Sequence, residues 1–171
     1  PPERAGMTPN KIAVTGGLGS GKSEFCGILR EMGYPVFSCD EINRELWKDP
    51  SYLSELAGLF PDCLTDGLPD KTKLSRKVFS DERARARLNA LSQPRIMQEL
   101  IGRMNGFPTT VFAEVPLLFE GGYEKLFDAV IALRRDKDKL EEKHWLIVEN
   151  DGDRAALKQK AELILQAIRS E

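Results

Sequence analysis

Short apolar runs alternate along this chain with segments whose apolar residues recur every three or four positions. The runs are rich in valine, isoleucine, leucine and phenylalanine, which suit strands. They predict strands at residues 12–15, 35–38, 110–115, 129–133 and 145–148. The run at 129–133 is apolar throughout, which is typical of a strand that is covered on both faces, as in a parallel sheet.

The segments between these runs predict helices with one apolar face. The first helix ends at Gly33, and its apolar face consists of Phe25, Ile28, Leu29 and Met32. The last helix is predicted at 154–169, with a buried stripe of Leu157, Ala161, Ile164, Leu165 and Ile168. Strands that alternate with helices predict an α/β fold in which five parallel strands form a doubly wound sheet.

A helical stretch at residues 49–106 interrupts this alternation, because no convincing strand appears in it. The expected helices lie at 51–60 and at 71–79, with further helices that start from Ser80 as a cap and from Pro94. Several helices between two strands indicate an inserted lid or substrate-binding subdomain. The expected domains are a nucleotide-binding core at 8–48 and 107–171 and a helical insertion at 49–106.

Composition and charge exclude several classes of protein. The 171 residues are enough for one α/β domain with an insertion, and 41% hydrophobic and 30% charged residues are ordinary for a globular chain. A net charge of −2 gives no reason to expect nucleic acid as a partner, and no apolar run is long enough to span a membrane. The three cysteines form no C-x-x-C pair or metal pattern, which favours a reduced, cytoplasmic compartment.

Residues 16–23 read Gly-Gly-Leu-Gly-Ser-Gly-Lys-Ser and fit the P-loop pattern G-x-x-x-x-G-K-[ST]. Glycines let the backbone turn its N–H groups inward as an anion-binding nest, and the following helix adds its positive end. Lys22 can reach the β- and γ-phosphates of a nucleotide, and the Ser23 hydroxyl can ligate Mg²⁺. The strand before the loop and the helix after it favour this interpretation over a glycine-rich turn without a ligand.

Two carboxylates follow the apolar part of predicted strands, where open α/β sheets bind their ligands. Asp40 comes just after the strand at 35–38, and its functional interpretation competes with a simple role as a helix N-cap. Glu114 lies near the end of the strand at 110–115, where P-loop proteins keep the acid that orders the Mg²⁺ water shell. Ser23 and Glu114 are therefore the expected metal-site residues.

Several motifs occur in a characteristic order: Thr15–Ser23, Val36–Asp40, Val78–Asp81, Val115–Glu120 and Asn150–Gly152. This order resembles that of the dephospho-CoA kinase family. A P-loop alone is common to many families, whereas the Pro-Leu-Leu-Phe-Glu run in its place, with Asp40 and the inserted helices, is far more specific. The resemblance extends from about Lys11 to the C-terminal helix.

The resemblance implies ATP- and Mg²⁺-dependent phosphorylation of the ribose 3′-hydroxyl of dephospho-CoA, which yields CoA and ADP. It implies that Asp40 meets the acceptor hydroxyl, with Lys22 and Thr15 as further catalytic residues. The expected ATP-binding residues are Gly17, Leu18, Gly19, Ser20, Gly21, Lys22, Ser23, Glu24, Asn150 and Gly152. The expected acceptor-binding residues are Asp40, Lys71, Arg76, Leu117, Phe119 and Glu120. A monomer or weak oligomer is expected.

The chain departs from the pattern of this family at four places. The family usually has threonine where Glu24 stands, an acid where Ser38 stands and a histidine where Gln93 stands. The helical lid between the fourth and fifth strands is short or missing here, with residues 134–139 as its remnant. Because lid arginines stabilise the transferring phosphoryl group, we favour a lid that is left out of the printed chain over a kinase without one.

Other functions fit parts of the same sequence. A GTPase switch would need a guanine-reading N-K-x-D run, and the chain has none. A non-catalytic nucleotide sensor fits the short lid, and another small-metabolite or nucleoside kinase fits the P-loop. Turnover of ATP in the presence of dephospho-CoA distinguishes these alternatives from the expected kinase.

Overall fold

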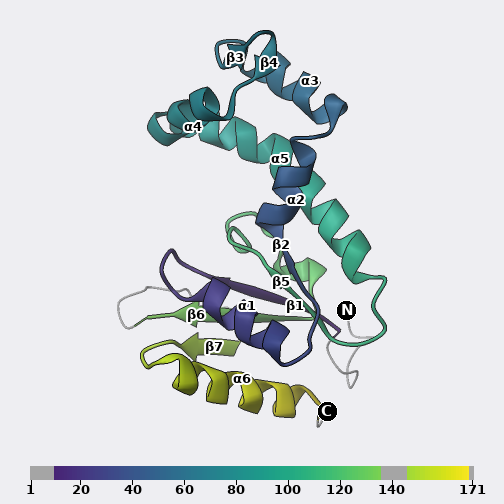
Figure 1. Ribbon diagram of the computed structural model, residues 1–171, viewed down its shortest axis with the longest axis vertical. Helices are drawn as coiled ribbons and strands as arrows, with labels where there is room; N and C mark the ends of the chain where they lie inside the picture. The colour runs from purple at the N-terminus through teal and green to yellow at the C-terminus, as the bar shows by residue number, and fades with distance from the viewer. Residues whose placement is uncertain (1–9, 136–145, 170–171) are drawn as a thin grey trace. The chain divides into compact units, whose positions relative to one another are not determined.

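The structure is a computed structural model that describes residues 10–135 and 146–169. Contacts between residues divide the chain into two compact units. The first unit comprises Pro1–Cys39 and Ile101–Glu171, and the second comprises Asp40–Leu100. Figure 1 labels the helices and strands of both units.

The first unit is built on a five-stranded sheet in the order β2-β5-β1-β6-β7, and every neighbouring pair is parallel. Its strands are β1 Lys11–Gly16, β2 Val36–Ser38, β5 Val111–Glu114, β6 Ala129–Arg134 and β7 Leu146–Glu149. The central strand, β1, is buried along most of its length because it has a neighbour on each side and apolar residues above and below. The predicted parallel α/β sheet is confirmed.

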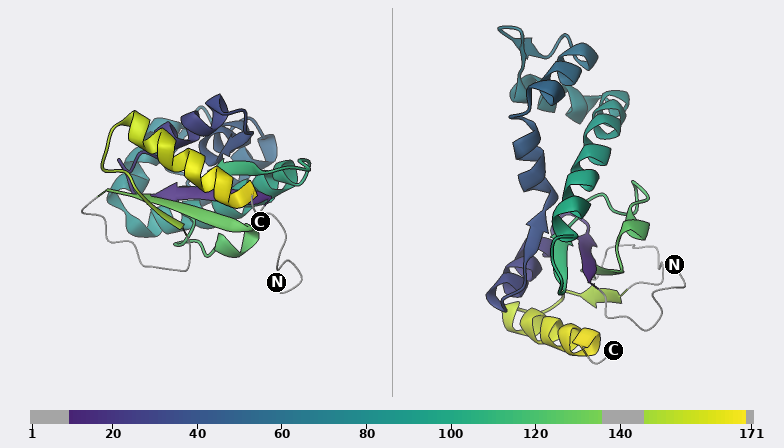
Figure 2. Two further views of the ribbon diagram at one scale, coloured as in Figure 1. Left: turned by 90° about the horizontal axis from the view of Figure 1, so that it is seen from below. Right: turned by 90° about the vertical axis from the view of Figure 1, so that its right-hand side faces the viewer.

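Two long helices of the first unit, α1 Lys22–Glu31 and α6 Arg154–Arg169, pack against each other and on the sheet (Figures 1 and 2). Their buried residues are those of the predicted apolar stripes, with Phe25, Ile28 and Leu29 from α1 and Leu157, Ala161 and Leu165 from α6. α6 begins and ends at the predicted residues. A short 3₁₀ helix, η2 Glu124–Leu126, precedes β6.

The second unit is mainly helical. Its elements are α2 Cys39–Leu46, α3 Pro50–Leu59, the short strands β3 Leu64–Thr65 and β4 Leu68–Pro69, α4 Lys71–Ser80 and α5 Glu82–Met104. Its core consists of Tyr52, Leu56, Phe60, Cys63, Leu74 and Ala84. The unit begins at Asp40 and thus takes in α2, which lies before the expected insertion at 49–106. Among the helices of the described residues, none combines the length and apolar character needed to cross a bilayer.

A small hairpin corrects the prediction that no strand occurs between the second and third strands of the core. β3 and β4 pair antiparallel. Asp66 and Gly67 form the turn with φ of 53° and 79°, the left-handed values that a two-residue hairpin turn requires. Each strand is only two residues long, so no alternating pattern reveals it in the sequence.

One long helix, α5, replaces the two helices that were expected to start at Ser80 and Pro94. Ser80 is the last residue of α4, and the Asp81 carboxylate caps α5 by accepting the backbone N–H groups of Arg83 and Ala84 at 3.0 and 3.2 Å. α5 runs through Pro94. Apolar residues of α5 are buried both before and after Pro94 in the sequence. The free energy gained by this burial outweighs the ~3 kcal/mol that an interior proline costs a helix.

Candidate active site

The P-loop connects the end of β1 to the start of α1. β1 ends at Gly16 and α1 begins at Lys22, so residues 17–21 lie at the carboxyl end of the central strand (Figure 1). Gly19 and Gly21 have φ of 77° and 93°, values that a residue with a Cβ adopts only with strain. The strand, the glycine loop and the helix follow one another in the predicted order.

Gly16 permits a close approach between the loop and the sheet. A Cβ at this position would lie 2.5 Å from the carbonyl oxygen of Leu133 in β6 and 2.5 Å from Ser20 Oγ. Ser20 is 1% exposed, and its hydroxyl has no hydrogen-bond partner among the described residues. Thr15, just before the loop, is also buried. The side chains of Thr15 and Ser20 are therefore turned into the protein.

The Lys22 ammonium group lies on the loop itself. Its Nζ donates to the carbonyl oxygens of Gly16 at 2.7 Å and Gly17 at 3.1 Å. It forms no ion pair with a carboxylate in the described part of the chain. Neutral carbonyls hold a cation less strongly than a carboxylate does, so the ammonium can exchange them for an anion.

Ser23 and Glu114, the two expected metal-site residues, are brought together beside the loop. The Ser23 hydroxyl donates to Glu114 Oε1 at 3.3 Å. Glu114 is the last residue of β5, and the strand register pairs it with Val14 of β1 and Ser38 of β2. Within residues 10–135 and 146–169, no three histidine, cysteine or carboxylate side chains form a metal-binding group. A cation here would need this pair together with water or substrate oxygens.

Cys26 follows the P-loop in α1 and is a packing residue. Burial, and to a lesser degree the charge of Glu114, raise the pKa of its thiol to about 12, while Arg30 and Lys22 act in the opposite direction. Only a thiolate is a good nucleophile or metal ligand. Cys26, like the equally buried Cys39 and Cys63, is a free thiol.

Asn150, directly after β7, contacts the P-loop backbone. Its side-chain Nδ2 donates to the carbonyl oxygen of Ser20 at 2.9 Å, and the residue is 5% exposed. Its own backbone N–H donates to the carbonyl oxygen of Arg134 at 2.8 Å. Gly152, the other residue of this motif, is exposed, and a Cβ there would lie 2.9 Å from the Cβ of Ala156. The structure thus places the Asn150 side chain against the P-loop backbone.

Glu24 is paired with an arginine that the sequence analysis did not identify. Arg154, the first residue of α6, lies 3.8 Å from Glu24 and 2.6 Å from Glu31. In sequence, 123 residues separate Arg154 from Glu31, so no local spacing could reveal the contact. The packing of α6 on α1 creates this contact. The charge of Arg154 then balances the charge of Glu24, which follows the P-loop residue Ser23.

The Pro-Leu-Leu-Phe-Glu run forms a series of turns after β5. Leu118 is completely buried, Leu117 and Phe119 are half-buried and Glu120 is exposed. The turns are closed by backbone hydrogen bonds from Gly121 N–H to Leu117 O at 3.1 Å and from Tyr123 N–H to Leu118 O at 2.9 Å. Leu118 anchors the run, which leaves Glu120 accessible to a ligand.

Three expected acceptor-site residues belong to the second unit. Asp40 is exposed in the first turn of α2, which already begins at Cys39, so the alternative interpretation of Asp40 as an N-cap is wrong. The Lys71 ammonium lies over the Trp47 ring, 5.0 Å from its centroid. Arg76 is exposed on α4, with no side-chain partner among the described residues.

The segment 134–139, expected as a lid remnant, is described only at its start. Arg134 is the last residue of β6 and pairs with Glu149 at 2.5 Å. The guanidinium group of Arg135 lies 4.0 Å from the position that a Cβ on Gly21 would occupy. Residues 136–139 lie outside the described residues, and the predicted lid stays a prediction.

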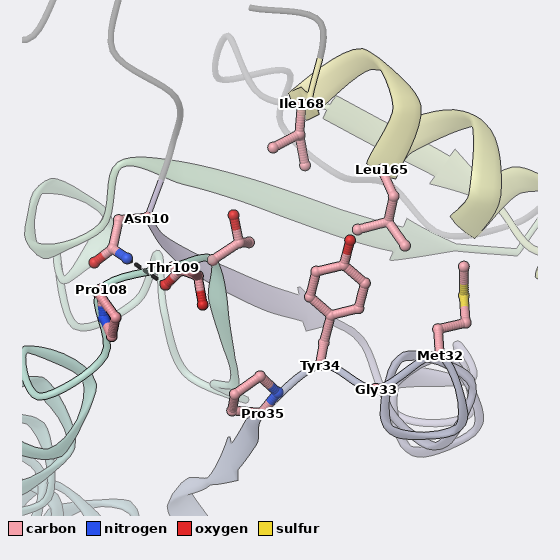
Figure 3. Close-up of a pocket in the computed structure, with 10 residues that line it drawn as sticks. Asn10, Met32, Gly33, Tyr34, Pro35, Pro108, Thr109, Leu165 and Ile168 are labelled. Carbon is pink, nitrogen blue, oxygen red and sulfur yellow. Dashed lines mark hydrogen bonds between the residues drawn. The ribbon is translucent and has the colours of Figure 1, made fainter.

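A pocket of about 550 Å³ lies at the amino-terminal ends of β1, β2 and β5 (Figure 3). It is lined by Asn10, Pro35 and Thr110, which immediately precede β1, β2 and β5, and by residues at the ends of α1 and α6. Tyr34 projects into it toward Leu165. Among the described residues, its lining contains no cationic side chain, so the pocket offers no positive side-chain charge to a phosphate.

Comparisons with known proteins agree on one family. A family model described as dephospho-CoA kinase matches residues 10–162. The dephospho-CoA kinase of Deinococcus radiodurans is 37% identical over 133 residues, which are 73% of this chain and 62% of that protein. The dephospho-CoA kinase of Nitrosomonas europaea is 39% identical over 127 residues, which are 71% of this chain and 63% of that protein.

Solved structures share the fold. The dephospho-CoA kinase from Campylobacter jejuni matches with a TM-score of 0.74 at 22% identity, over 93% of this chain and 96% of that chain. The protein TT1252 from Thermus thermophilus matches with a TM-score of 0.74 at 26% identity, over 93% and 97% of the two chains. In sequence, the match spans less than two thirds of the length of the two curated relatives above.

Proposed function

This chain belongs to the dephospho-CoA kinase family, and from that premise we propose that it phosphorylates the ribose 3′-hydroxyl of dephospho-CoA with ATP to give CoA and ADP. The observation that carries this proposal is the P-loop at the carboxyl end of β1, with Lys22 on the loop and the Ser23–Glu114 pair beside it. Phosphoryl transfer depends mainly on positioning and on charge stabilisation, and these groups suit both tasks.

The P-loop binds the triphosphate through its backbone N–H groups and Lys22. Residues 17–21 and the start of α1 supply amides and the positive end of a helix. Lys22 exchanges its hydrogen bonds to the carbonyls of Gly16 and Gly17 for bonds to the β- and γ-phosphate oxygens. The phosphate oxygens are negatively charged, so the ammonium group binds them more strongly than it binds neutral carbonyls. Its charge then stabilises the transferring phosphoryl group.

Ser23 and Glu114 would hold Mg²⁺. A hydroxyl and a carboxylate are hard oxygen ligands, and the 3.3 Å hydrogen bond between Ser23 and Glu114, which holds the two oxygens close together, supports this proposal. When bound, Mg²⁺ neutralises charge on the β- and γ-phosphates. Glu114 orders ligand water and accepts the Ser23 hydrogen bond, which orients the hydroxyl oxygen.

Asp40 acts on the acceptor in this mechanism. The bond between the γ-phosphorus and the β–γ bridging oxygen breaks, a bond to the ribose 3′-oxygen forms, and the hydroxyl proton passes to the Asp40 carboxylate. Asp40 follows the end of β2 by two residues and is exposed, so its carboxylate is accessible to a ligand. Thr15 is buried and supports the loop rather than touching the substrate.

Residues of the second unit, Asp40–Leu100, take part in binding the acceptor. Arg76 offers an exposed cation to the phosphates of dephospho-CoA. Lys71 can serve the same end from its place over Trp47, since a cation–π contact leaves its N–H groups free on the outer side. Leu117 and Phe119 provide apolar surface, and Glu120 provides a hydrogen-bond acceptor.

The buried free thiols support a reduced, cytoplasmic location.

An acceptor screen tests this function. ADP formation is measured with the purified protein, ATP and Mg²⁺, alone and with dephospho-CoA, nucleosides or other small alcohols. We expect turnover with dephospho-CoA, and a product whose mass and phosphorus spectrum place a new phosphate on the ribose 3′-oxygen. ATP binding without turnover of any acceptor would instead support the sensor, and turnover of nucleosides alone would support another kinase.

A further inference from the structure

Asn150 is held in place from two directions. Its backbone N–H donates to the carbonyl oxygen of Arg134 at 2.8 Å, which extends the β6–β7 pairing by one residue. Its side chain leaves the strand direction and donates to the carbonyl oxygen of Ser20 at 2.9 Å. Since the residue is 5% exposed, this hydrogen bond is shielded from water and from competition by solvent.

The accepting carbonyl belongs to the peptide that joins Ser20 to Gly21. The described residues contain no cis peptide bond, and in a planar trans peptide the C=O and N–H groups point in opposite directions. A carbonyl of Ser20 that points at Asn150 therefore directs the N–H of Gly21 away from Asn150. Rotation of this peptide would turn the Gly21 N–H toward Asn150 and break the bond between Asn150 and the Ser20 carbonyl.

The missing side chain of Gly21 leaves room for the side-chain amide of Asn150. A Cβ on Gly21 would collide with Asn150 Nδ2. The residue also has a φ of 93°, so a side chain is excluded both by space and by backbone conformation. The glycine that starts the Gly-Lys-Ser part of the motif and the asparagine after β7 thus form one packed contact.

We infer that Asn150 is a positioning residue, which holds the Ser20–Gly21 peptide so that the Gly21 N–H faces the phosphates of the nucleotide. This inference rests on the proposed function, because it assigns the P-loop to a nucleoside triphosphate. This role differs from a direct contact with the adenine base, because the amide nitrogen of Asn150 already donates to the loop.

Three possible roles of Asn150 differ in which ligand affinities they affect. A residue that orients a P-loop amide contributes to the binding of every ligand with a polyphosphate, including inorganic tripolyphosphate. A residue that contacts the base contributes to ATP and adenosine and not to tripolyphosphate. A residue that only stabilises the fold lowers the unfolding temperature and leaves the affinities of the folded protein unchanged.

The test uses Asn150→Leu, which keeps the shape of the side chain and removes the donor without adding charge. Dissociation constants for ATP, inorganic tripolyphosphate and adenosine are measured by calorimetry at a temperature where each variant is folded. Loss of one shielded hydrogen bond to the loop should weaken ATP and tripolyphosphate by the same factor, about tenfold. Adenosine should bind as it does to the wild type.

Gln159→Leu is the matched control, because it makes the same change of an amide to leucine at an exposed position of α6. It should leave all three affinities unchanged. Asn150→Ser is the second variant if Asn150→Leu does not fold, since a hydroxyl is small enough for the site. Serine is too short to reach the Ser20 carbonyl, so the same selective loss is expected.

Three results would overturn the inference. One is unchanged tripolyphosphate binding in the folded variants, and another is a loss confined to ATP and adenosine, which would make Asn150 a base contact. The third is an equal loss of all three ligands. Failure of the proposed function is a separate observation: wild-type protein that binds tripolyphosphate but does not phosphorylate dephospho-CoA would refute the kinase assignment and leave the role of Asn150 intact.

Discussion

At the scale of single residues, Lys22 is the side chain whose charge the P-loop mechanism depends on most directly. Its hydrogen bonds to the carbonyls of Gly16 and Gly17 lie at the protein surface and add little to stability. Lys22→Ala should therefore lower kcat by about 10²-fold or more, as for other preorganised electrostatic contacts, and leave the unfolding temperature nearly unchanged. Steady-state kinetics and thermal unfolding measure the two effects, and near-normal turnover would exclude this role.

Asp40 provides a second prediction at the same scale. Asp40→Asn preserves the size of the side chain and removes its ability to accept a proton, so kcat should fall by about 10²–10⁴-fold. The ATP dissociation constant should change little, because the proposed partner of Asp40 is the acceptor hydroxyl. If ATP binding collapses and the residual turnover is normal, Asp40 belongs to the metal site instead.

The buried thiol of Cys26 should make the unfolding free energy depend on pH. Its thiol has a pKa of about 12 in the folded protein against an ordinary value of 9.0. The unfolded thiol ionises first as pH rises, so this residue contributes no pH dependence below about pH 9 and destabilises the fold progressively between pH 9 and 12. Between pH 8 and 10 the wild type should lose about 1.4 kcal/mol more unfolding free energy than Cys26→Ala.

Urea unfolding of both proteins at the two pH values measures this difference, and the other two cysteines cancel in the comparison. Parallel pH profiles for the wild type and Cys26→Ala would show that the thiol does not titrate as a buried group.

At the scale of elements, α5 contains a proline that the helix tolerates. Pro94 is exposed, so it contributes little packing, and it supplies no N–H for the bond to the carbonyl of Ala90. Pro94→Ala restores that donor, and we expect the unfolding free energy to rise by ~1–3 kcal/mol. Denaturant unfolding measures the change, with the exposed Gln98→Ala on the same helix as a control that should move stability by less than about 0.5 kcal/mol. An unchanged or lower stability would show that the Pro94 ring makes stabilising contacts of its own.

Elements long enough for their apolar pattern to recur several times were predictable from the sequence. Elements of only a few residues were not. α6 carries its apolar stripe over four turns, which defined both of its ends. The hairpin of β3 and β4 offers two residues per strand and depends on Asp66 and Gly67 in the left-handed region. The start of α5 was misplaced because Ser80 and Asp81 are both good caps, and only the observed hydrogen bonds distinguish them.

At the scale of the whole molecule, the division into two units predicts separable effects on the two substrates. Arg76 lies in the second unit and carries an exposed charge, whereas the P-loop lies in the first. Arg76→Glu should raise the KM for dephospho-CoA by about tenfold and leave the KM for ATP within about twofold, since a phosphate contact is replaced by repulsion. The exposed Arg83, reversed in charge in the same way, is the control and should change neither constant. Equal effects of Arg76→Glu on both substrates would contradict a separate acceptor-binding unit.

The sequence by itself determined the α/β class and the P-loop and indicated Ser23 and Glu114 as candidate metal-site residues, because these depend on local periodicity and on motifs with fixed spacing. The tertiary structure decided the strand order, which brings Glu114 next to Val14, and the pairs between distant segments. Arg154 with Glu24 and Asn150 with the Ser20 carbonyl are such pairs. Neither leaves a local signature, because the contact is created when α6 and β7 pack beside the loop and not by the residues that flank it.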